Sequence, residues 1–192
     1  GDRRIQPHTH LFWGRTFLKY TFEESQQYFD AGLTLGTSLR ADRLSTYRLG
    51  GVVPFVSEFP LSIPGYYFQE ISAKKFALFN AEYSIPITPQ KNWRLTFYGA
   101  AGLVDYLQGL EQPGRWHTGL GGGITYVSPR GAWFISLIYG HGFNALRDEQ
   151  KGANQVGLLF QYDFDALTKP GLRPFEPRLS PYRSRGGERI FN

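Results

Sequence analysis

The sequence of 192 residues contains no cysteine and no methionine. The absence of cysteine excludes a disulfide scaffold and a cysteine-ligated metal site. Because the initiating methionine is missing, we expect a processed product or an excerpt of a longer chain. No run approaches the ~18 consecutive apolar residues of a membrane-spanning helix. Residues 1–13 also lack the apolar stretch of a secretory signal, so any export signal is expected upstream of them.

Charge is sparse, and it is unevenly placed. The net charge is +5, and the residues after Phe164 contribute +3 of it, with six basic side chains against three acidic ones. We therefore do not interpret the positive charge as a nucleic-acid surface. Prolines at positions 170, 174, 177 and 181 disfavour helix and sheet. Residues 165–192 are predicted to form an extended or disordered Pro/Arg-rich tail, or a recognition peptide for a protein partner.

Aromatic residues are plentiful, at 17% of the chain, and many alternate with polar or small residues. In the last such stretch, Phe160, Tyr162 and Phe164 alternate with polar residues and resemble the aromatic-ended signal of outer-membrane barrels. Strict alternation predicts strands with two different environments. Seven segments share the pattern: residues 10–22, 28–39, 76–87, 93–104, 116–127, 132–143 and 153–164.

Two architectures fit such strands. In a soluble sandwich the apolar face is a core, whereas in a transmembrane β-barrel it contacts lipid and the polar face lines the lumen. We favour the antiparallel transmembrane β-barrel, because the segments are long and carry aromatic residues near their ends. Short connections (23–26, 88–92, 128–131) also alternate with longer ones (41–75, 105–115, 145–152). Outer-membrane barrels show this alternation between periplasmic and external loops.

The loop lengths also predict an orientation. If the longer loops are external, residues 1–9 form an external segment, residues 10–164 form the barrel segment, and the tail is periplasmic. Seven is an odd number of strands, and an open sheet would leave two unpaired edges in lipid. We therefore expect upstream strands or a second chain to complete the barrel, unless the polar residues 1–9 supply an eighth strand.

One part of the sequence carries a specific combination of motifs. A Leu-Gly-Gly step at 49–51 and a loop motif at 63–66 precede a strand containing Ala77, Asn80, Ala81, Glu82, Pro86 and Ile87. This combination resembles the BamA–TamA superfamily of outer-membrane assembly barrels, the bacterial surface antigen family. The resemblance covers residues 28–164 and implies the C-terminal part of a sixteen-stranded barrel. It also implies a role in outer-membrane protein insertion or transport, without enzymatic activity or cofactor.

The loop motif departs from the family pattern at one position. Pro64 stands where the family has an arginine that would reach a carboxylate on the inner wall. Pro64 has no charge and no donor, so any lumenal pairing with Glu82 must use another residue, such as Lys74 or Lys75. This departure favours an alternative function: a diverged barrel that anchors a partner or a fused periplasmic domain.

Individual residues allow simple and functional interpretations. Glu82, beside Asn80, is either a solvated lumenal carboxylate or the partner of the inward-folding loop. The loop tip, Pro64, Gly65, Tyr66 and Tyr67, is either a lumenal plug or a plain turn. Glycines at 119 and 121–123 favour close backbone approach or curvature over phosphate binding.

An embedded lipid hydrolase is the least favoured hypothesis. The stretch around His141 and Asn144 resembles the His-x-Ser-Asn-Ala segment of lipid A deacylases, which use a Ser–His–acid arrangement. Phe143 occupies the position of the nucleophile and has no hydroxyl. His8 and His10 show only a weak metal-ligand spacing.

Overall fold

The computed structural model describes residues 8–51, 61–129, 132–148 and 150–162. These residues form one antiparallel sheet, and none of them is helical. The described part contains no helix that is long and apolar enough to cross a membrane. The strands are β1 (His10–Phe22), β2 (Gln27–Leu39), β3 (Tyr47–Leu49), β4 (Ile71–Pro86), β5 (Trp93–Tyr106), β6 (Trp116–Val127), β7 (Trp133–Arg147) and β8 (Gln150–Tyr162).

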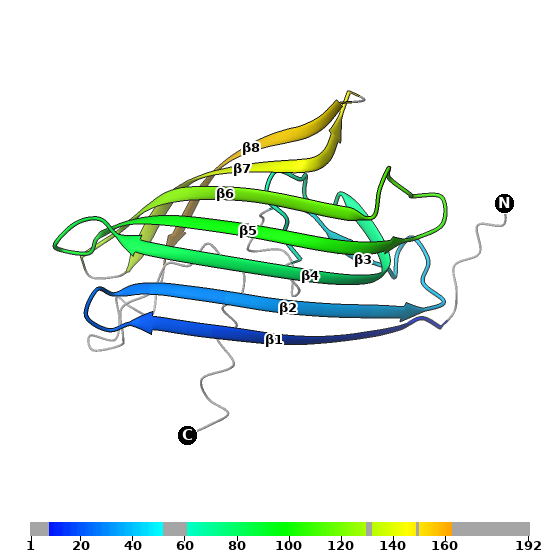
Figure 1. Ribbon diagram of the computed structural model, residues 1–192, viewed down its shortest axis with the longest axis horizontal. Helices are drawn as coiled ribbons and strands as arrows, with labels where there is room; N and C mark the ends of the chain where they lie inside the picture. Colours follow the sequence, from blue (N-terminus) through cyan, green and yellow to red (C-terminus); the bar gives the residue numbers. More distant parts are fainter. Residues whose placement is uncertain (1–7, 52–60, 130–131, 149, 163–192) are drawn as a thin grey trace, which may run out of the picture.

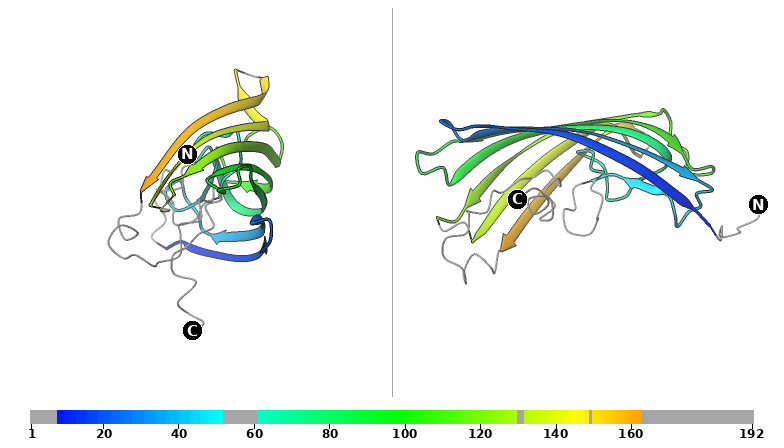
Figure 2. Two further views of the ribbon diagram at one scale, coloured as in Figure 1. Left: turned by 90° about the vertical axis from the view of Figure 1, so that its left-hand side faces the viewer. Right: turned by 90° about the horizontal axis from the view of Figure 1, so that it is seen from below.

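The strands follow one another in an open sheet. Their order is β1-β2-β4-β5-β6-β7-β8, and the short β3 pairs with β4 off this path (Figure 1). Among the described residues the sheet does not close, so β1 and β8 are its two edges. It is bent into a trough with a convex and a concave face (Figure 2). The prediction of an all-β antiparallel fold is thus confirmed.

The predicted strand count needs correction from seven to eight. The additional strand, β3, has three residues and lies within the region predicted as a loop at 41–75. A three-residue strand is too short for a period-two pattern to be recognised. β4 also starts at Ile71, five residues before the predicted segment, because residues 71–73 pair with β3.

The connection between β7 and β8 is shorter than the sequence predicted. Residues 145–152 were expected to form a loop, but β7 continues to Arg147 and β8 begins at Gln150. The pairing has a register shift between Gly142 and Leu146, and the hairpin bends away from the other strands there (Figure 1). A bulge of this kind breaks the alternation locally, which is why the pattern failed to mark the strand.

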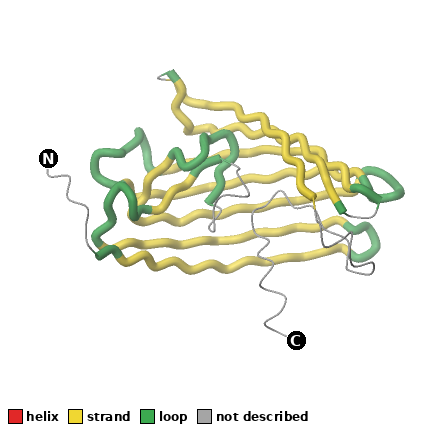
Figure 3. Tube along the Cα trace, turned by 180° about the vertical axis from the view of Figure 1, so that it is seen from behind, coloured by secondary structure: helices red, strands yellow, loops and turns green. Residues whose placement is uncertain are grey.

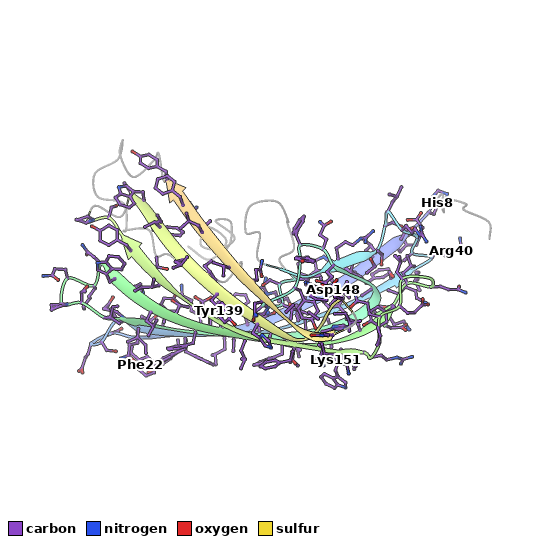
Figure 4. The ribbon with its side chains drawn as sticks, turned by 90° about the horizontal axis from the view of Figure 1, so that it is seen from above. His8, Phe22, Arg40, Tyr139, Asp148 and Lys151 are labelled. Carbon is purple, nitrogen blue, oxygen red and sulfur yellow. The ribbon has the colours of Figure 1, made fainter. Side chains whose placement is uncertain are left out.

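Alternate residues of each strand lie on opposite faces, as the pattern predicts. Directly opposed residues share a face, so Ala31, Ala81 and Gly99 form one row on the convex side. Phe22 and Arg40, at opposite ends of the β1–β2 hairpin, mark the length of the sheet (Figure 4). The main buried cluster lies on the concave side and combines strand residues with loop residues such as Ile63 and Tyr66.

Candidate functional site

The convex face is covered with exposed apolar side chains. Every long strand contributes to it: Phe12, Leu18, Tyr20 and Phe22 from β1, Leu33 and Leu35 from β2, Phe79 from β4, Phe97 and Leu103 from β5, Leu120 and Ile124 from β6, Leu137 and Tyr139 from β7, and Val156, Leu158 and Phe160 from β8. Soluble monomers rarely expose a continuous apolar surface of this extent. The convex face is therefore a continuous exposed apolar surface that spans the sheet.

Aromatic rings form a row at one end of this face. The ring centroids of Trp93 and Tyr126 lie 5.0 Å apart, those of Tyr126 and Trp133 5.5 Å, and those of Trp133 and Phe160 6.1 Å. The row crosses the ends of β5, β6, β7 and β8. Amphipathic rings at one level of a sheet are typical of a boundary between an apolar and an aqueous phase. Of the predicted terminal signal, Phe160 and Tyr162 lie in β8, and Phe164 lies outside the described residues.

A loop lies across the concave face. We call its residues 61–70 the crossing loop; in Figure 3 it lies in front of the strands. Its base is held by main-chain hydrogen bonds to the glycine pair that follows β3. Gly50 N donates to Leu61 O at 3.0 Å, and Gly51 N donates to Tyr67 O at 2.8 Å. The segment is therefore a fixed part of the concave face.

Glycines of the sheet make room for the tip of the crossing loop. Gly65 has a φ of 80°, and a Cβ on it would lie 1.9 Å from Gly142 N. A Cβ on Gly119 would lie 2.3 Å from Pro64 O. Any side chain at these positions would collide with backbone. The expectation that Gly119 permits close backbone approach agrees with this geometry, and the approaching segment is the Pro64–Gly65 tip.

Tyr66, at the tip of the crossing loop, takes part in a buried chain of hydrogen bonds. Its hydroxyl lies 3.0 Å from Nδ1 of His117, and the hydroxyl of Tyr106 bonds Nε2 of the same ring. Tyr106 donates its proton to Gly114 O at 2.8 Å, so it accepts from Nε2–H. A neutral imidazole has a single N–H, and Nδ1 therefore accepts from Tyr66. The chain runs in one direction from the crossing loop to the β5–β6 loop.

Tyr66 keeps its proton at ordinary pH. Burial raises the pKa of its hydroxyl, and the negative charge of Glu70 acts in the same direction. Both effects disfavour the phenolate. The hydroxyl is thus a permanent donor, which the accepting nitrogen of the buried His117 requires.

Glu82 and Asn80 are both buried on the concave face, but they bind different partners. Oε1 of Glu82 accepts a hydrogen bond of 2.8 Å from the Tyr28 hydroxyl on β2. Nδ2 of Asn80 donates to Ser62 O in the crossing loop at 2.9 Å. Of these two residues, which were predicted to face the lumen, Asn80 forms a hydrogen bond with the crossing loop.

An ion pair at the other end of the crossing loop was missed from the sequence. Arg147, the last residue of β7, bonds both carboxylate oxygens of Glu70 at 2.9 Å. Its guanidinium carbon also lies 3.6 Å from the Tyr67 ring centroid. Because Pro64 is uncharged, the sequence indicated that another residue supplies the positive charge of a loop–strand ion pair. Lys74 and Lys75 were considered for this role, and Arg147 was not.

A polar hollow adjoins this system where β5 ends. It has a volume of about 430 Å³ and borders Tyr106. Two basic and two acidic side chains line it together with amides; the lining residues other than Tyr106 are Lys74, Asp105, Gln108, Glu111, Gln112, Gly114 and Arg115. Gln112 connects the hollow to the crossing loop through a hydrogen bond from Nε2 to Glu70 O at 3.4 Å.

The residues behind the hydrolase hypothesis do not come together. Nδ1 of His141 lies 2.8 Å from Oδ1 of Asn154, and Asn144 instead accepts hydrogen bonds from Thr118. Phe143 is an exposed apolar side chain. In the part of the chain that the structure describes, no group of three or more His, Cys, Asp or Glu side chains is arranged to hold a metal ion.

A known relative would have to share the antiparallel sheet, its apolar convex face and the crossing loop. No protein-family model matches this chain, and no curated protein matches it significantly.

Proposed function

We propose that the chain forms part of the wall of a transmembrane β-barrel in the bacterial outer membrane, of the type that assembles or translocates proteins. The apolar convex face is the single observation that carries the membrane part of this proposal. Its side chains are exposed along all seven long strands, and acyl chains would solvate them while water would not. The row of aromatic rings fits the interfacial girdle of such a barrel.

The two open edges support a partnership with further strands. The outer edges of β1 and β8 have no neighbouring strand among the described residues, and unpaired backbone groups are costly in lipid. Additional strands, from a longer chain or a second polypeptide, would close the barrel. The concave face, with buried polar residues such as Ser84, Thr96 and Thr125, would then line its lumen.

The assembly role rests on the resemblance of residues 47–87 to assembly barrels and on the fixed crossing loop. In such barrels the seam at the last strand can accept a client strand by β-augmentation. β8 would be that last strand. Pro64, which supplies no charge at the loop tip, supports the second candidate: a barrel that anchors a partner or a fused periplasmic domain.

Membrane residence is tested by extracting the full-length gene product from bacterial outer membranes. We expect it to resist carbonate and urea washes and to require detergent for solubilisation. The purified protein should bind lipid vesicles and float with them in a density gradient. A folded protein that stays dissolved in detergent-free buffer would overturn the proposal.

The assembly role is tested separately, in vesicles that already contain the folded protein. An unfolded outer-membrane protein is added, and its folding rate is compared with the rate in empty vesicles. Faster folding supports assembly. An unchanged rate, together with recovery of a tightly bound periplasmic protein from native membranes, supports the anchor.

A further inference from the structure

The turn at the base of the crossing loop organises its own carboxylate. Glu70 N donates to Tyr67 O at 3.3 Å, and Tyr67 N donates to Oε2 of Glu70 at 2.7 Å. Between them Gln69 adopts a left-handed conformation, with φ at 56°. The Glu70 side chain is therefore fixed in place by its own turn and presents its carboxylate in one orientation.

Arg147 meets this carboxylate with two contacts at once. Its two terminal nitrogens bond one carboxylate oxygen each, and its planar group stacks on the ring of Tyr67. Bidentate pairing fixes geometry as well as charge, and lysine does not reproduce it. The arginine is supplied by the end of β7, beyond the register shift between Gly142 and Leu146. The bend of the hairpin thus belongs to the same arrangement as the ion pair.

The tip and the base of the crossing loop are held by different means. The tip is held by shape, because Gly65 and Gly119 permit contacts that any side chain would block. The base is held by its main-chain hydrogen bonds to Gly50 and Gly51 and, at Glu70, by charge; the side chains of Arg147 and Glu70 keep exposed fractions of 23% and 13%. Water and ions can reach the base, whereas Ile63 and Tyr66 near the tip are completely buried.

We propose that Arg147 and Glu70 form the latch that holds the crossing loop against the concave face, and that this latch is its point of release. The wall supplies the cation and the loop supplies the anion. Breaking the pair removes the charged contact of residues 67–70 and leaves neutral hydrogen bonds such as Gly51 N to Tyr67 O, so these residues open before the tip does. Arg147 is thus a positioning residue. The latch rests on the proposed function only in that a closed barrel would make the released loop a gate of the lumen.

The test measures hydrogen–deuterium exchange of the crossing loop in the full-length protein in detergent micelles. The variants are Arg147→Glu, Glu70→Arg and the exchanged pair carrying both substitutions. We expect each single variant to speed exchange in residues 61–70 about tenfold or more, because like charges then oppose each other. The exchanged pair should restore part of the protection, because it regains the ion pair but arginine at position 70 cannot accept the hydrogen bond from Tyr67 N. Exchange in β4 and β5 should stay unchanged throughout.

Lys151→Glu is the matched control, since Lys151 is an exposed cation on the same hairpin as Arg147 and its replacement changes the net charge equally. If Arg147→Glu does not fold, Glu70→Gln tests the same contact with a side chain of equal size. Loop protection in the single variants equal to that of the control overturns the latch, and so does an exchanged pair no better than either single variant. The readout needs no membrane activity, so failure of the latch is distinct from failure of the proposed function.

Discussion

The two faces of the sheet are made by the same strands, yet they are organised differently. On the convex face, neighbouring residues such as Leu35, Phe79 and Leu103 are all apolar and exposed, and the pattern repeats with little variation. On the concave face, buried polar groups, glycines and apolar side chains each occupy a particular place under the crossing loop. If the convex face contacts fluid lipid, as proposed, it needs only to be apolar, whereas the concave face needs specific residues because it receives a folded loop.

The strongest test of this difference places a charge on each face of β8. Val156 is an exposed convex residue, and Gly157 next to it has open space where a side chain would be. In lipid vesicles we expect Val156→Arg to lower the free energy of unfolding by about 2–4 kcal/mol, as for lipid-facing arginine near the bilayer centre, because Val156 lies farther than Leu158 from the aromatic row. Gly157→Arg is the control and should cost clearly less. Urea unfolding in vesicles measures both; equal effects would contradict the assignment of the faces.

The next largest effect is expected where the crossing loop touches the strands. Gly119→Ala puts a methyl group against Pro64 O, which should lower the free energy of unfolding by about 1–3 kcal/mol. Gly157→Ala is the matched control, because nothing lies within 4 Å of its Cβ position. Unfolding of both variants in detergent would show the difference. A Gly119→Ala protein as stable as the control would mean that the loop does not dock there.

The buried hydrogen-bonded chain gives a somewhat smaller effect. Tyr66→Phe removes the donor to His117 and leaves a buried nitrogen unsatisfied, at a cost of about 1–2 kcal/mol. Tyr20→Phe is the control, since Tyr20 is exposed on the convex face of β1. Thermal unfolding followed by circular dichroism compares the two variants. The same loss for both would show that the hydroxyl of Tyr66 adds nothing specific.

The smallest effect is expected in the aromatic row of the convex face. Trp133→Leu keeps an apolar side chain but removes the ring contacts to Tyr126 and Phe160. We expect a loss of about 0.5–1.5 kcal/mol in vesicles, as for single aromatic pairs. Phe97→Leu, at an exposed ring of β5 on the same face but outside this row, serves for comparison. A similar loss at both positions would argue against a special role for the row.

The sequence predicted the strands much better than it predicted the concave face. β1 and β6 begin and end where the alternation does, at His10–Phe22 and Trp116–Val127. The three-residue β3 and the extension of β7 to Arg147 were missed, because one is too short and the other follows a bulge. The loop motif at Pro64–Tyr67 was identified, but the residues that hold the loop were identified only in part.

What the sequence determined by itself was local: which segments are strands and which residues share a face, since both follow from a period of two along the chain. The contacts of the crossing loop were decided by the tertiary structure. Tyr66 and His117 are 51 residues apart, and Glu70 and Arg147 are 77 apart. Whether such residues meet depends on strand order, register and the bend of one hairpin, which are properties of the assembled sheet and of no single segment.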